Sequence, residues 1–184
     1  TLTDGKWSGY PTTTDLYING AFKQFTLVEG KLTAILMYNG TLKLSGNAVA
    51  GEEMPNYASA EETPWYEYRN NIVSLQLEKV KHIGNYAFAG LSKITTVTLP
   101  TNLRTIGDYA FADCVSLKTA NMVDTINSYG KGVFKNTALT TVTLPKNVTE
   151  VADELFMNCT ALTKFNASGS LTAIGAKAFM NSGL

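Results

Sequence analysis

One phenylalanine returns at a nearly constant interval along residues 72–184. Successive members are 23, 23, 22 and 23 residues apart: Phe88, Phe111, Phe134, Phe156 and Phe179. A fixed period of roughly 20–50 residues is typical of proteins built from stacked repeats. One unit of this length cannot bury its own apolar face, whereas several stacked units can. The pattern therefore predicts about five repeats of 22–23 residues, with the phenylalanines lying over one another along one axis.

Alternating apolar residues mark a strand in each repeat. Alternation with a period of two predicts a strand with one buried face. Pro100 and Pro145 end two of these strands, where no further N–H is needed for pairing. The predicted inward residues are Leu75 and Leu77, Val97 and Leu99, Ala120 and Met122, Val142 and Leu144, and Phe165 and Ala167.

The residues around each phenylalanine predict a short helical turn with a cap at both ends. Asn85, Asp108 and Asp153 stand three residues before a phenylalanine, where their side chains can accept backbone N–H groups as N-caps. Two residues after each phenylalanine stands a residue type that tolerates the left-handed conformation ending a helix. These five residues are Gly90, Asp113, Asn136, Asn158 and Asn181.

Residues 1–71 do not share the period, so we expect a β-rich N-terminal cap domain before a solenoid at 72–184. Asn19-Gly20 lies between residues 15–18 and 21–28, and Asn39-Gly40 lies between 33–38 and 41–46. Asn-Gly between apolar runs predicts a tight hairpin, so we expect two hairpins. Residues 46–63 are expected to form a loop, and Pro64 is expected to open a short helix at 64–71.

An aromatic cluster follows Pro64. Trp65, Tyr66 and Tyr68 stand within four residues. One interpretation is a cap over the end of the stack, which solenoids require. The other is a patch that binds carbohydrate or peptide, because exposed aromatic residues favour recognition.

The outward strand face is the other candidate binding surface. It is a hydroxyl and amide ladder with few charges: Ser74, Gln76, Thr96, Thr98, Thr119, Asn121, Thr141, Thr143, Lys164 and Asn166. Threonine also suits any solvated strand, so the ladder by itself is compatible with a purely structural face. Solenoids, however, bind partners along extended faces. The ladder has few of the large side chains that dominate binding energies, so a partner held by it alone is expected to bind weakly.

The pattern of His, Cys and Glu residues predicts neither a catalytic site nor a cofactor site. His82 is the only histidine, and it is expected to be a surface residue in a turn of the first repeat. No clustered Cys or His ligands predict a metal site. Glu52, Glu53, Glu61 and Glu62 have oxygens suited to Ca²⁺ but also read as a solvated loop.

The two cysteines are expected to be buried and unpaired. Each stands three residues after one of the five repeated phenylalanines. Cys114 and Cys159 therefore occupy equivalent positions two repeats apart. Stacked strands are about 4.8 Å apart, which places the two Cα atoms nearly 10 Å from each other. A disulfide requires less than about 7 Å.

Charge and hydropathy narrow the classes of partner. The 184 residues carry a formal net charge of zero, which argues against nucleic acid as a ligand. No apolar run is long enough for a membrane span. The chain starts at Thr1 without a basic-then-apolar signal, so we expect it to be a piece of a longer protein.

The repeats resemble the BspA-type leucine-rich repeat. The similarity rests on "LSKITTVTLPTNLRTIGDYAFADCVSL" and "LTTVTLPKNVTEVADELFMNCTAL" and covers residues 72–184. The segment from Gly40 to Ile72 is also similar to the stretch that often precedes such repeats. The third repeat departs from the pattern, because Tyr129 replaces Ile and the proline is missing, so an irregular loop is expected there.

The resemblance implies a β-dominated α/β solenoid, a right-handed leucine-rich-repeat stack with a parallel sheet and short helical turns. It also implies a secreted or cell-surface bacterial protein that binds an extracellular protein or glycan, with adhesion as the expected role. The alternatives are a structural spacer that presents another domain, or a non-catalytic part of a larger extracellular enzyme. The last repeat ends at Leu184 where the next strand should begin, so we expect a continuation or an end-to-end contact with a second copy.

Overall fold

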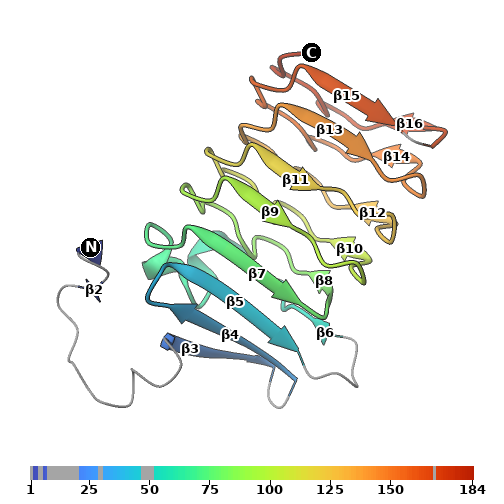
Figure 1. Cartoon of the computed structure of the whole chain (residues 1–184). Helices are drawn as coiled ribbons and strands as arrows, with labels where there is room; N and C mark the ends of the chain where they lie inside the picture. The colour runs from blue at the N-terminus through green and yellow to red at the C-terminus, as the bar shows by residue number, and fades with distance from the viewer. Residues whose placement is uncertain (1, 4–5, 8–20, 29–30, 47–51, 168) are drawn as a thin grey trace.

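The protein is a β-dominated solenoid of stacked coils (Figure 1). The computed structural model describes residues 2–3, 6–7, 21–28, 31–46, 52–167 and 169–184. Within these residues the only helices are two short 3₁₀ turns, η2 (Ala60–Glu62) and η3 (Tyr66–Tyr68). The coils follow one another in chain order up to the C-terminus, and each contributes two short strands.

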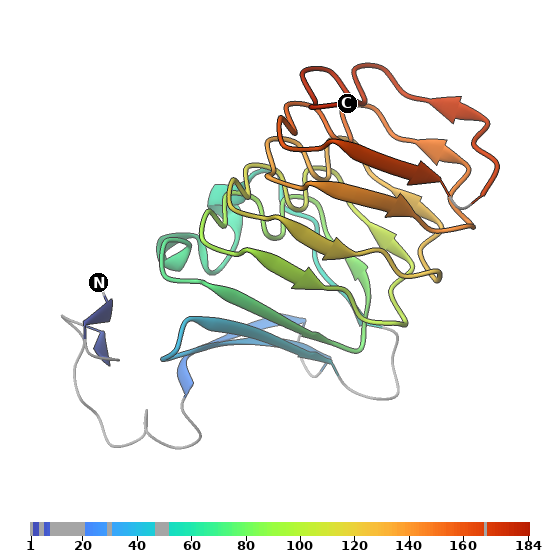
Figure 2. The same cartoon turned by 45° about the horizontal axis from the view of Figure 1, so that its top comes forward.

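The two strands of each coil form two separate columns (Figure 2). The first column contains β7 (Ser74–Glu78), β9 (Thr96–Thr98), β11 (Thr119–Asn121), β13 (Thr141–Leu144) and β15 (Lys164–Ala167). The second contains β8 (Val80–Ile83), β10 (Thr105–Ile106), β12 (Ser128–Tyr129), β14 (Glu150–Val151) and β16 (Ala173–Ile174). All recorded pairs within the columns are parallel, as in Ile106 with Ile83 on one side and Tyr129 on the other. The second strand of each coil was not predicted from the sequence.

The predicted helical turn around each phenylalanine is wrong, because the backbone there is left-handed at two places. The predicted position, two residues after each phenylalanine, does have positive φ, at 75° for Gly90 and 56–60° for Asp113, Asn136, Asn158 and Asn181. A second left-handed residue stands two positions before each phenylalanine. Its φ is 54–59° at Tyr86, Tyr109, Gly132, Glu154 and Lys177. A right-handed helix cannot run through such alternation, so the segments are turns.

The predicted N-caps instead join neighbouring coils. The Asn85 side-chain oxygen accepts the backbone N–H of Asp108 at 2.8 Å. The Asp108 carboxylate in turn accepts the N–H of Lys131, also at 2.8 Å. Asp153 repeats the contact with the N–H of Ala176 at 2.6 Å. Each side chain thus satisfies a backbone donor one coil further along, where it was expected to satisfy its own helix end.

The predicted aromatic stack forms the core. Centroids of successive rings from Phe88 to Phe179 lie 5.3, 5.8, 5.9 and 5.6 Å apart, with interplanar angles of 26° or less. Phe88, Phe111, Phe134 and Phe156 are fully buried. The strand residues are buried as expected in the first, second and fourth coils. Ala120 and Met122 of the third coil are only half-buried, and in the last coil Phe165 is half-buried and Ala167 is exposed. Among the described residues, no coil covers Phe165 and Ala167 on that side.

The N-terminal strands extend the first column on the far side of β7. β3 (Ala21–Val28), β4 (Leu32–Met37) and β5 (Thr41–Gly46) pair antiparallel in that order, with Asn39 and Gly40 between β4 and β5. β5 then pairs in parallel with β7, so a single four-stranded sheet crosses from the hairpin into the repeats. The hairpin expected at Asn19-Gly20 lies outside the described residues.

Two further short pairings complete the strands. β1 (Leu2–Thr3) and β2 (Lys6–Trp7) pair antiparallel. The described residues of the segment expected to be a loop at 46–63 contain η2 and also β6 (Glu52–Glu53), which pairs in parallel with β8.

The stack is divided between the third and fourth coils. β11 and β13 belong to different sheets, and so do β12 and β14. The backbone bonds recorded across this junction run along the phenylalanine edge, from Gly132 N–H to Asp153 O and from Phe134 N–H to Leu155 O, with N···O distances of 2.9 and 3.0 Å. The third repeat was expected to be irregular, and it is the one in which Tyr129 and Met122 meet through a 3.2 Å contact between hydroxyl and sulfur.

Candidate functional site

The predicted polar ladder lies on the outward face of the first strand column. Nine of its ten residues, all except half-buried Ser74, are exposed. The parallel register aligns them across coils, with Thr96 opposite Thr119 and Thr141 opposite Lys164. The structure therefore brings these side chains into rows along one surface.

Some members of the ladder already have partners. Asn121 accepts the N–H of Leu99 at 2.6 Å and donates to its carbonyl at 3.3 Å, which extends the pairing of β9 and β11 by one residue. The Ser74 hydroxyl bonds to Thr41 at 2.8 Å. Asn121 is thus a strand clamp, and its amide is less free for a ligand than its residue type suggests.

A hollow of about 350 Å³ interrupts this face between β11 and β13. It lies at the divided junction, where the strands are not paired. Thr119, Thr141, Thr143 and Asp124 line it, and half-buried Met122 and buried Pro145 add apolar surface. The ladder therefore contains one recessed place where a side chain of a partner can be inserted.

Of the two interpretations of the aromatic cluster, the exposed patch is wrong for Trp65. Its side chain is 1% exposed, and its ring stacks on Phe88 with centroids 5.8 Å apart. Tyr68 is half-buried and packs against the core, 5.5 Å from Phe22 between ring centroids. The chain buries these rings because they close the apolar interior of the first coil. Only Tyr66 of the three lies in a surface recess.

That recess is a groove of about 510 Å³ between the 59–69 segment and the turns of the first coils. The Tyr86 and Tyr109 rings stack within it, with centroids 5.2 Å apart. The Arg69 guanidinium lies 3.9 Å from the centroid of Tyr66. Tyr86 and Tyr109 were not predicted as site residues from the sequence. Their shared position could have indicated that they lie side by side, because each stands two residues before a phenylalanine of the stack, in consecutive repeats.

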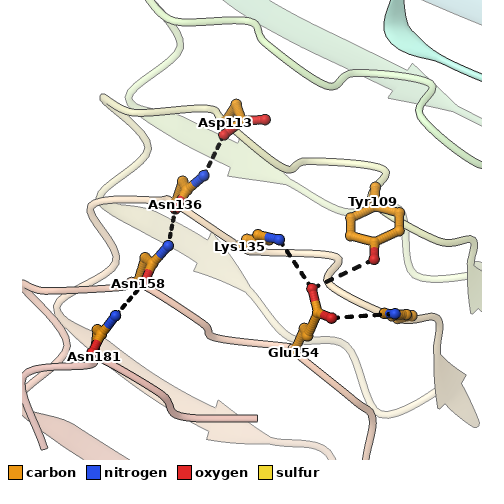
Figure 3. Close-up of polar contacts among 8 residues, drawn as sticks. Tyr109, Asp113, Lys135, Asn136, Glu154, Asn158 and Asn181 are labelled. Carbon is orange, nitrogen blue, oxygen red and sulfur yellow. Dashed lines mark hydrogen bonds and ion pairs between the residues drawn. The ribbon is translucent and has the colours of Figure 1, made fainter. Parts of the chain in front are cut away.

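Tyr109 reaches across the next coil to a charged cluster (Figure 3). Glu154 accepts hydrogen bonds from Lys135 at 3.0 Å and, more weakly, from the Tyr109 hydroxyl at 3.5 Å. Its other oxygen pairs with Lys131 at 3.2 Å. The hydrogen bonds from Lys135 and Lys131 lower the pKa of Glu154, and Glu154 raises the pKa of Lys131.

Gly132 makes that reach possible. A Cβ built on Gly132 would stand 2.4 Å from a ring carbon of Tyr109, so the missing side chain leaves the space that the ring occupies. Its φ of 59° is also unfavourable for other residues.

A ladder of side-chain amides runs beside this cluster (Figure 3). Asn181 donates to Asn158 at 2.9 Å, Asn158 donates to Asn136 at 2.8 Å, and Asn136 donates to Asp113. The ladder therefore ends on a carboxylate at the edge of the groove. The next position in the series is Gly90, which has no side chain to continue it.

The residues considered for chemistry have structural partners. His82 lies on β8 and not in a turn, and its Nδ1 is 2.5 Å from the Thr105 hydroxyl oxygen. Cys114 and Cys159 are buried and unpaired, as predicted. Their thiols lie within hydrogen-bond distance of the Phe88 and Phe134 carbonyls, at 3.2 and 3.0 Å.

The described part of the chain contains no group of three or more His, Cys, Asp or Glu side chains placed to hold a metal ion. It also contains no helix with the length and hydropathy needed to span a membrane.

Comparison with protein families gives one match. The model of the BspA type leucine rich repeat region fits residues 64–184 in six copies. This range starts at the residue before Trp65 and includes all five of the stacked phenylalanines. It is a repeat family, and the match indicates no catalytic family. A search of curated proteins gave no significant match.

Two solved bacterial structures share the architecture. A leucine-rich repeat protein from Eubacterium ventriosum is 23% identical with a TM-score of 0.62, over 79% of this chain and 44% of that one. A leucine rich cell surface protein from Faecalibacterium prausnitzii is 24% identical with a TM-score of 0.62, over 89% of this chain and 48% of that one. The chain thus spans less than half the length of either protein, and the likeness shows a shared fold.

Proposed function

The chain belongs to the BspA-type leucine-rich repeat family, and from this premise we propose that it is a non-enzymatic binding protein of the bacterial cell surface. Its proposed role is adhesion to host proteins or to other cells through the outward face of β7, β9, β11, β13 and β15. A fold does not determine a function, so the proposal rests on the surface itself.

The observation that supports this role most is the exposed polar ladder. Nine aligned side chains face solvent, and Lys164 is the only charged one among them. Such a surface offers hydroxyl and amide groups at regular intervals to an extended partner. The hollow beside Met122 adds a recess of mixed polar and apolar lining in which a side chain of a partner can be buried.

The proposal is tested by placing charges on the face. One variant combines three substitutions, Thr96→Glu, Thr98→Glu and Thr119→Glu. All three residues are exposed, and their side chains make no hydrogen bond to the described part of the protein. We expect this variant to lose at least tenfold in binding to immobilised extracellular-matrix proteins and host-cell preparations that retain the unmodified protein. Asn121 is left intact because it clamps Leu99.

Ser128→Glu is the matched control, since Ser128 is exposed on the second strand column. It should bind as the unmodified protein does, and circular dichroism should show that both variants are folded. Equal binding by the triple variant would contradict the proposed face. Absence of binding by the unmodified protein to every preparation would favour a spacer role.

A further inference from the structure

We propose that the groove between Tyr66, Tyr86 and Tyr109 is a second binding site, and that its ligand is a short neutral saccharide. The groove lies on the turn side of the coils and shares no residue with the strand ladder. It is therefore independent of the adhesion surface proposed above.

The groove forms where two positions of the repeat carry unusual residues and lie close together in the structure. The residue with positive φ that stands two positions before the phenylalanine is a tyrosine in the first two coils. In the next three coils the same position is occupied by Gly132, Glu154 and Lys177. The left-handed position after the phenylalanine carries Asp or Asn in four repeats but glycine in the first, at Gly90. A Cβ at Gly90 would have nothing within 4 Å, so this glycine leaves open space in the groove.

The size and the composition of the lining indicate the class of ligand. A volume of about 510 Å³ lies within the range of roughly 300–1,000 Å³ that is usual for small-molecule sites. Tyrosine offers an apolar ring and a hydroxyl on the same side chain, which matches a ligand with apolar and hydroxyl-bearing surfaces.

The charges of the lining balance. Its ionisable carboxylates are Glu61 and Asp113, and its cations are Arg69 and Lys135. Glu61 bonds the Tyr66 hydroxyl at 3.4 Å, Arg69 donates to the Tyr66 carbonyl at 2.9 Å, and Lys135 pairs with Glu154. No excess charge is left to select an anion or a cation. Hydrogen-bonding groups fixed in this way suit a neutral polyhydroxylated ligand.

The experiment measures binding of defined probes to the folded protein. Cellotriose, mannotriose and tri-N-acetylchitotriose are tested by saturation-transfer NMR and by titration. The acidic 3′-sialyllactose and a pooled decapeptide library are tested in parallel. We expect at least one neutral trisaccharide to bind, and Tyr86→Ala and Tyr109→Ala each to weaken that binding at least tenfold.

Gly90→Asn provides a variant that adds atoms and removes none. Asparagine tolerates the φ of 75°, and its amide can extend the ladder to Asp113, so the melting temperature should be unchanged. The new side chain enters the groove, and we expect it to weaken saccharide binding at least tenfold. The triple variant of Thr96, Thr98 and Thr119 should bind the saccharide normally, which separates this site from the strand face.

Three results would overturn the proposal. They are failure of all three neutral probes to bind, preference for the acidic saccharide or the peptides, and saccharide binding that survives both Gly90→Asn and the tyrosine substitutions. The last result would place a saccharide site elsewhere on the protein.

Discussion

Trp65 stacks on Phe88, with ring centroids 5.8 Å apart and an interplanar angle of 17°. The two residues are 23 positions apart, the same interval that separates most ladder phenylalanines. The Trp65 indole N–H also donates to the Ala87 carbonyl at 3.0 Å. On another side, Phe25 of β3 meets the indole edge-on at 6.2 Å. Trp65 is therefore a sixth ring of the stack, and it joins the repeats to the N-terminal sheet.

Trp65→Ala should destabilise the protein by about 3–5 kcal/mol, because it leaves a cavity where a fully buried ring was. Trp65→Phe should cost less, since it retains a ring over Phe88 and loses the hydrogen bond to Ala87. Urea unfolding followed by circular dichroism measures both. Glu67→Ala, at an exposed neighbouring position, is the control and should change little. An alanine variant as stable as the control would show that the indole does not support the stack.

The position of a ring in the stack should set its contribution to stability. Phe134 is fully buried between Phe111 and Phe156, whereas Phe179 is half-buried in the last coil. We expect Phe134→Ala to cost about 3–5 kcal/mol and Phe179→Ala to cost less. Thermal unfolding of the two variants provides the comparison. Equal shifts in melting temperature would be inconsistent with this order of stacking.

A glycine substitution tests the passage of Tyr109 over the third coil. Gly132→Ala places a Cβ against the Tyr109 ring and imposes a left-handed conformation that costs roughly 1–2 kcal/mol for a non-glycine residue. We expect a loss of at least that amount in the free energy of unfolding. Adding Tyr109→Ala should recover the steric part and leave the backbone part. Strict additivity of the two changes would mean that the residues are not coupled.

The ion pairs of Glu154 should make stability depend on acid pH. Lys135 and Lys131 hold the pKa of this carboxyl below its usual value of 4.5, so the folded state favours the charged form. The stabilisation is complete above pH 4.5 and is lost as the pH falls through the lowered value. The difference in free energy of unfolding between the unmodified protein and Glu154→Gln should therefore be present at pH 7 and shrink below about pH 4.5.

Glu150→Gln serves as the control for this pH series, because Glu150 is exposed and lies outside the cluster. Its profile should run parallel to that of the unmodified protein. A Glu154→Gln profile that is also parallel down to strongly acidic pH would exclude a contribution from the ion pairs.

The two thiols should be unreactive in the folded protein. Burial raises the pKa of Cys114 to about 12 and also raises the pKa of Cys159. Because the thiolate is the reactive species, a disulfide reagent at pH 8 should label both cysteines slowly in buffer and rapidly in denaturant. Fast labelling of two thiols per native molecule would contradict the buried positions.

The sequence predicted the stack of phenylalanines, most of the inward strand residues and the left-handed Asn and Asp positions. Each of these features depends on a local requirement that is repeated in every coil. The sequence predicted a helix around each phenylalanine wrongly. The second left-handed position carries Tyr86, Tyr109, Glu154 and Lys177, residue types that give no local signal for positive φ. There the conformation follows from backbone bonds to the next coil, such as Tyr86 N–H to Asp108 O at 2.9 Å, which no single repeat reveals.

The candidate surfaces show the same limit. The strand face follows directly from alternation, so its members could be named in advance. The groove depends on Tyr66 lying beside Tyr86 and Tyr109, and that proximity is decided by the burial of Trp65. Of the two interpretations of the aromatic cluster, the cap fits Trp65, because its ring is buried against the core, and Tyr66 is the member of the cluster that lines the groove.

The divided junction between the third and fourth coils has a mechanical consequence. The strand columns on both sides are unpaired there, and the recorded backbone bonds are confined to the phenylalanine edge. Away from that edge, the Asn147 side-chain amide donates to the Asp124 carbonyl at 2.8 Å. A junction held by so few bonds flexes more readily than one paired along both strand columns. If the protein is pulled along the axis of the stack, it should open first between the third and fourth coils, and a ligand bound across β11 and β13 should raise the force that opening requires.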